Sequence, residues 1–132
     1  MGAWGSGNFE NDAVLDWVST LKGWQSVKAV LEYVARASRD AYLSANVCCT
    51  SLGAAEIVAA CIGQPSVESP EAVKSWVAAN RNGCSDELRS LATTATRRIE
   101  AESELQELFD EGARNEEWHA VVSDLLRRLS SA

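Results

Sequence analysis

The chain has 132 residues, a net charge of −7 and a pI of about 4.7, and its length suits one domain but is too short for two sizeable cores. Apolar residues make up 46% of it and charged residues 23%, which is the composition of a folded globular protein rather than a disordered one. The acidic balance disfavours nucleic-acid binding, because phosphate contacts need clustered lysines and arginines.

The first ten residues, MGAWGSGNFE, predict a loop rich in glycine. Gly2, Gly5 and Gly7 allow the backbone to take positive φ angles, so the loop can fold closely around a large ring. Trp4 is the natural ring, since a buried tryptophan removes a large apolar area from water. We therefore expect residues 1–10 to pack across the rest of the fold as an N-terminal plug.

Apolar stripes at helical spacing predict six helices over residues 11–131. The first three span residues 11–21, 26–44 and 52–62. Asn11 is chemically the better cap for the first, with Glu10 as the alternative, and Ser26 and Ser51 can cap the other two. The third is apolar nearly all round, which is typical of a helix buried on several sides.

The other three predicted helices lie in the second half of the chain. One begins at Ser69-Pro70, with the serine as cap and the proline in the first turn. The next is the longest, over residues 86–111, capped by Ser85 and ended by Gly112. The last follows Asn115. Its apolar stripe is the clearest in the chain and consists of Trp118, Val121, Val122, Leu125 and Leu129.

No sustained alternation of apolar and polar residues predicts a strand. The expected fold class is therefore all-α. We predict a compact single-domain bundle of about six helices over residues 11–131, with the glycine and tryptophan loop of residues 1–10 packed on it.

No segment reaches the roughly 18 apolar residues that a membrane helix needs, and the N-terminus lacks the basic and apolar regions of a signal peptide. We therefore expect a cytoplasmic protein that contacts no membrane. Its four cysteines should be reduced core residues, because their spacing fits no zinc site. They are Cys48, Cys49, Cys61 and Cys84.

Three segments together are typical of one known family. The opening has the pattern M-G-x-W-G-x-G-x-F-x-N-D, and Asp16-Trp17 follows it. AAEIVAA covers residues 54–60, and a helix with a tryptophan and several leucines closes the chain. In these features the chain resembles, over nearly its whole length, the bacterial family known as domain of unknown function 4259. The resemblance implies a bacterial, cytosolic, single-domain protein, and it brings no activity and no catalytic residue.

Asp12 and Asp16 stand four residues apart, so their carboxylates share one face of the first helix. Like charges so placed repel unless a cation lies between them. That cation is either an arginine or a divalent metal, and the arginine is favoured because two carboxylates make an incomplete metal site. The available arginines include Arg36, Arg39, Arg97 and Arg98.

Glu56 is the only charge in the apolar segment LGAAEIVAACI. A buried carboxylate needs a partner or a proton. In one interpretation it forms a structural ion pair, or accepts hydrogen bonds from exposed backbone N–H groups such as those of the glycine loop. In the other, it is a general base or a ligand in a pocket that is open to solvent and holds a second titratable group.

Glu116 and His119 match the Glu-x-x-His spacing of bundles that hold two metal ions, but such a site needs two pairs and His119 is the only histidine. We therefore expect His119 to be a surface residue on the polar side of the last helix. Of the five tryptophans, Trp17, Trp76 and Trp118 fit inner stripes. An exposed ring at Trp4 or Trp24 would mark a site for a partner.

Two classes of function follow from these features. The leading hypothesis is a non-enzymatic interaction protein that presents an acidic face to a basic protein, for example as an immunity or antitoxin-type inhibitor of a basic toxin enzyme. The alternative is a small carboxylate-based metal- or ligand-binding enzyme centred on Glu56. The acidic face would comprise Glu10, Asp12, Asp16, Glu100, Glu102, Glu104, Glu107, Asp110 and Glu111.

The residues expected to bind a ligand or partner are Trp4, Asp12, Asp16 and Glu56. No catalytic residue, metal or cofactor is assigned. Homo-oligomerisation through an apolar helix face stays open, and light scattering at two concentrations would test it.

Overall fold

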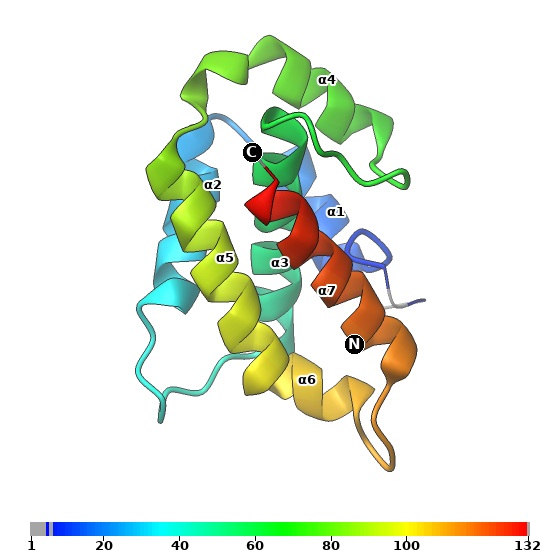
Figure 1. Cartoon of the computed structure of the whole chain (residues 1–132). Helices are drawn as coiled ribbons and strands as arrows, with labels where there is room; N and C mark the ends of the chain where they lie inside the picture. The colour runs from blue at the N-terminus through cyan, green and yellow to red at the C-terminus, as the bar shows by residue number, and fades with distance from the viewer. Residues whose placement is uncertain (1–4, 6, 132) are drawn as a thin grey trace.

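The computed structural model describes residue 5 and residues 7–131, and within them it contains seven α-helices, one 3₁₀ turn and no strand (Figure 1). The all-α fold predicted from the sequence is confirmed. The elements are α1 (Asp12–Ser19), α2 (Trp24–Ala35), α3 (Ala45–Cys61), α4 (Glu71–Ala79), the 3₁₀ turn η1 (Arg81–Gly83), α5 (Asp86–Ala101), α6 (Glu104–Phe109) and α7 (Glu116–Ser130).

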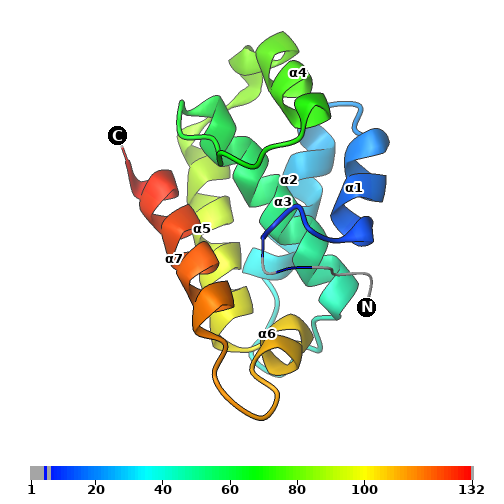
Figure 2. The ribbon, with the colours of Figure 1, turned by 90° about the vertical axis from the view of Figure 1, so that its right-hand side faces the viewer.

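Helix α3 is the centre of the fold. It contacts α1, α2, α5 and α7 along its length, while α4 lies near one of its ends and α6 near the other (Figures 1 and 2). Twelve of its seventeen residues are buried. This position explains the sequence, since a helix covered on all sides needs apolar residues all round.

Small residues let other helices approach α3 closely. A side chain at Gly53 would collide with Val14 of α1, which is fully buried. Glycine is needed here for the close packing of two helices, because a larger residue would push α1 away from α3.

Two predicted helices meet in a longer loop than the sequence indicates. Helix α2 ends at Ala35 and α3 begins at Ala45, with Ser44 rather than Ser51 as its cap. The guanidinium of Arg98 donates hydrogen bonds to several carbonyls of the intervening loop, among them that of Ser38 at 2.8 Å and that of Ala41 at 3.1 Å. An arginine distant in the sequence thus holds residues 37–41 out of a helix.

The longest predicted helix is broken in two. Helix α5 ends at Ala101, and the hydroxyl of Ser103 caps α6 by accepting a hydrogen bond from the N–H of Gln106 at 3.0 Å. The same hydroxyl donates to the carbonyl of Ile99 at 2.8 Å, so one side chain closes both helix ends.

Other predicted helix ends agree with the structure. Asn11, Ser85 and Asn115 cap α1, α5 and α7, and Gly112, predicted to end a helix, has a positive φ angle after α6, as Gly63 has after α3. Helix α4 begins one residue later than predicted, because Pro70 rather than Ser69 takes the capping position. The cap of α2 is Gly23 and not Ser26.

None of the helices formed by the described residues is long and apolar enough to cross a membrane. The four cysteines are free, with Cys48 and Cys49 buried and the other two partly so. Burial raises the pKa of Cys49 to about 11, which keeps its thiol protonated and unreactive.

Candidate functional site

A buried ion pair joins the centre of the fold to its last helix. Glu56 of α3 is only 2% exposed. Its Oε1 accepts a hydrogen bond from Nη1 of Arg128 at 2.7 Å, and its Oε2 accepts one from Nη2 at 2.9 Å. This bidentate geometry uses both carboxylate oxygens and gives the buried charge the partner it needs.

The N-terminal loop and α7 complete this ion pair. The amide nitrogen of Asn8 donates to Oε2 of Glu56 at 2.8 Å, and Nε of Arg128 donates to Asp124 at 2.8 Å. Burial alone would lower the pKa of Arg128, but the hydrogen bonds to Glu56 and Asp124 outweigh it and raise that pKa. Arg128 therefore stays charged, and the network ties the loop to α3 and α7.

The two described glycines of the loop lie against carboxylates. A side chain at Gly5 would collide with Glu10, and one at Gly7 would collide with both Glu10 and Glu68. The φ angles of these two glycines depend on residues 4 and 6, which lie outside the described residues, so their expected positive φ angles stay a prediction. A larger residue at either position would require these flexible glutamate side chains to shift.

An acidic groove of about 360 Å³ opens beside the ion pair. Four carboxylates line it, from Glu56, Glu68, Glu117 and Asp124, and Arg128 supplies the one guanidinium among the described lining residues. Figure 2 shows the described part of the N-terminal loop in front of α3, between α1 and α7, and its residues 7–9 form one wall of the groove. Val67 at its edge is 98% exposed. The groove is therefore negatively charged, with an apolar rim.

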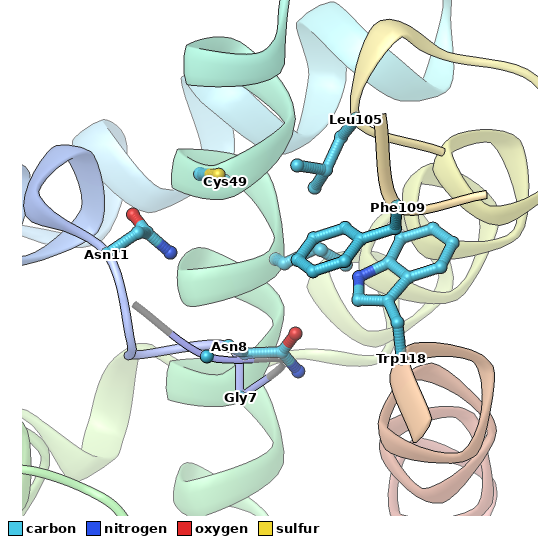
Figure 3. A pocket seen from close by; sticks show the side chains of 9 residues that line it. Gly7, Asn8, Asn11, Cys49, Leu105, Phe109 and Trp118 are labelled. Atoms are coloured by element: carbon cyan, nitrogen blue, oxygen red, sulfur yellow. The ribbon is translucent and has the colours of Figure 1, made fainter. Parts of the chain in front are cut away.

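A much smaller cavity shares Gly7 and Asn8 with the groove as lining residues (Figure 3). Its volume of about 10 Å³ leaves room for about one water molecule. Trp118 stacks on Phe109 in its wall, with ring centroids 5.2 Å apart. The amide oxygen of Asn8 is buried and has no hydrogen-bond partner in the described part of the chain, so a water would suit it.

A second charged cluster surrounds His119, at the junction of α5, α6 and α7. Its Nδ1 lies 2.8 Å from Oε2 of Glu100, and its Nε2 lies 2.9 Å from Oδ2 of Asp110. His119 is only 5% exposed, so the expectation of a surface histidine is wrong. It lies next to Trp118 and one turn before Val122 of the apolar stripe, and that spacing could have placed it at the edge of the core.

The family model described as "Domain of unknown function (DUF4259)" matches residues 2–121. The chain belongs to this family. The resemblance found in the sequence is therefore confirmed, and the description assigns no activity. No curated protein and no solved structure matches the chain. Glu56 and His119 of this DUF4259 chain lie within the matched residues, whereas Asp124 and Arg128 follow them.

The structure describes three of the four residues predicted to bind a partner, and these three differ in exposure. Glu56 is buried, Asp12 and Asp16 are exposed on α1, and Trp4 lies outside the described residues of this DUF4259 chain. No arginine among the described residues pairs with Asp12 or Asp16, so the favoured arginine interpretation is wrong there. In the same residues no three acidic, histidine or cysteine side chains could hold a metal ion.

Trp24, which falls in a loop between predicted helices, lies in a helix in the structure. It is the first residue of α2, and its indole N–H donates to the carbonyl of Asn80 at 2.7 Å. Its ring packs edge-on against Trp76 at 5.0 Å and closely against Gly83. The ring is therefore engaged within the fold rather than offered to a partner.

Several residues of the predicted acidic face make contacts within the fold. Glu100 and Asp110 bond to His119, and Glu104 accepts hydrogen bonds from the hydroxyl of Tyr42 and, at 2.7 Å, from the N–H of Ala45. These three carboxylates therefore connect parts of the fold to one another. Sequence reasoning missed the groove because Glu68 and Glu117 come from segments that only the tertiary fold brings together.

Proposed function

We propose that the chain is a non-enzymatic interaction protein whose acidic groove, lined by Glu56, Glu68, Glu117 and Asp124, binds a cationic segment of a basic protein. The carboxylates of Glu56, Glu68 and Asp124, which outnumber the one guanidinium among the described residues of this groove, carry the proposal. The net charge of −7 supports it, since a field of the same sign over the whole molecule would attract a basic partner.

The groove also suits the shape of a lysine or arginine side chain. Such side chains place their methylene groups on apolar surface while the charged end stays near water or a carboxylate. Val67, Ala120 and Val121 offer apolar surface beside the acids. Within the groove Arg128 pairs with Glu56 and Asp124, and among the described residues it makes no hydrogen bond to Glu68.

The geometry at Glu56 argues against the enzyme alternative. A general base needs a free carboxylate oxygen within reach of a substrate proton. Both oxygens of Glu56 accept hydrogen bonds from Arg128, and one also accepts from Asn8. A substrate would have to break a buried ion pair before Glu56 could act.

A capture experiment with matched variants tests the proposal. Tagged wild-type protein is incubated with lysate of the native host at low and at high salt, and bound proteins are identified by mass spectrometry. The Glu68→Gln/Glu117→Gln variant removes two groove carboxylates. The control, Asp40→Asn/Glu102→Gln, removes two exposed carboxylates elsewhere and leaves the net charge of the two variants equal.

We expect one basic protein to bind at low salt, to be lost at high salt, and to bind the control but not the groove variant. A partner that is insensitive to salt, equal loss in both variants, or no partner at all would contradict the proposal. If the captured protein is an enzyme that the chain inhibits, the function is that of an immunity or antitoxin-type inhibitor.

A further inference from the structure

The only histidine of the chain connects three helices through carboxylates. His119 of α7 contacts Glu100 of α5 through Nδ1 and Asp110, the residue that ends α6, through Nε2. The side chains are largely shielded from water, with exposed fractions of 6% for His119, 24% for Glu100 and 16% for Asp110. Both ring nitrogens are thus occupied by acceptors.

Two carboxylates can be satisfied only by a protonated ring. An imidazolium has two N–H donors, whereas neutral histidine has one, and its other nitrogen would turn a lone pair toward a carboxylate. Burial by itself lowers the pKa of His119, but the hydrogen bonds to Asp110 and Glu100 outweigh burial and raise it.

The two carboxylates differ in how firmly they are held. Asp110 also accepts hydrogen bonds from the N–H of Asn115 at 2.8 Å and from the side chain of Gln106 at 2.9 Å. Within residues 7–131, Glu100 makes no polar contact besides that to His119. When the ring loses a proton, Glu100 is therefore the carboxylate free to leave.

We propose that His119 is a pH-sensitive link, which holds α5 to α7 through Glu100 when protonated and releases Glu100 when neutral while keeping Asp110. The neutral ring then carries its proton on Nε2. The link between α6 and α7 survives the change, and the link between α5 and α7 does not.

The other charged groups around His119 do not change which carboxylate is released when the ring becomes neutral. Arg97 of α5 and Arg114 of the loop before α7 line the same hollow of about 580 Å³, and Arg114 opposes protonation of the ring. Arg114 is itself paired with Glu116 at 2.7 Å. On α3, the nearest charge in the core is Glu56, which Arg128 holds more than two turns further along α7.

NMR on the full chain tests the proposal, because a single histidine gives one unambiguous signal. The ring signals are followed with pH, and long-range nitrogen couplings identify the neutral tautomer. We expect a pKa above the ordinary 6.5 and the Nε2–H form at high pH. A pKa at or below 6.5, or a neutral ring protonated on Nδ1, would overturn the proposal.

The Glu100→Gln variant distinguishes a charge-dependent contact between Glu100 and His119 from a contact that depends only on the shape of the side chain. Glutamine keeps the shape of glutamate, and its amide N–H can donate to the Nδ1 lone pair of a neutral ring. We expect the pKa of His119 to fall in this variant, with amide exchange near residue 100 no longer changing as the ring titrates. Glu102→Gln, at an exposed neighbour, should leave both unchanged. An unchanged pKa in Glu100→Gln would contradict the inference.

Discussion

Single residues far apart in the sequence settle where charge lies inside this fold. Glu56 and Arg128 are separated by 72 positions, yet they form its buried ion pair. The sequence predicts that Glu56 needs a partner, because no other charge lies in its segment. The sequence does not show that this partner is Arg128. That residue stands beside Arg127 at a helix end, where arginines commonly face water and interact favourably with the helix dipole.

Removing one member of this pair should cost more than removing both. Arg128→Met leaves the Glu56 carboxylate buried without a cation, and we expect a loss of about 3–5 kcal/mol in the free energy of unfolding. The double variant Glu56→Met/Arg128→Met should lose clearly less than the single one, because no buried charge remains. Urea unfolding at neutral pH measures both.

Asp124 provides the matched control for this prediction. Its carboxylate also bonds to Arg128, but about half of that side chain is exposed. Asp124→Asn should therefore cost less than about 1 kcal/mol. Equal losses in the Arg128 and Asp124 variants would show that burial does not set the strength of these contacts.

At the scale of elements, local signals place helix ends correctly where nothing distant competes. Asn11, Ser85 and Asn115 cap helices as their chemistry predicts. The prediction fails at residues 36–44, where Arg98 of α5 binds the loop carbonyls. It also fails at residues 102–103. The apolar stripe continues across these residues, although the helix ends there and the Ser103 hydroxyl bonds to both helix ends.

The break between α5 and α6 should depend on the Ser103 hydroxyl. Ser103→Ala removes the cap of α6 and the bond to Ile99, and we expect a loss of about 1 kcal/mol or somewhat more. Ser85→Ala, which removes only a cap from α5, is the comparison and should cost no more. Thermal unfolding measures both, and a neutral Ser103→Ala would contradict this role of the hydroxyl.

The contact between α1 and α3 gives a second test at this scale. Alanine normally favours a helix over glycine, yet Gly53→Ala should destabilise the protein by about 1–3 kcal/mol, because the new methyl group meets Val14. Val14→Ala makes room for that group. The double variant should therefore lose less than the sum of the two single losses, and a strictly additive result in urea unfolding would contradict the close contact.

For the whole molecule, the carboxylates and the histidine together limit stability to a window of pH. Hydrogen bonds from Asn115, Gln106 and His119 hold the pKa of Asp110 well below its usual 3.8, and hydrogen bonds from Tyr42 and Ala45 lower the pKa of Glu104 from 4.5. A lowered carboxyl pKa adds stability that is complete above the unfolded value and is lost as the pH falls through the folded one.

The contribution of His119 to stability changes with pH in the opposite direction. Its folded pKa lies above the unfolded 6.5, so its contribution is complete below pH 6.5 and is lost as the pH rises through the folded value. We therefore expect maximal stability between about pH 4.5 and 6.5, with losses on both sides. Urea unfolding from about pH 3 to pH 8 measures the curve. Glu100→Gln should flatten only the part above 6.5, and a wild-type curve that keeps rising to pH 8 would contradict the contribution of the histidine.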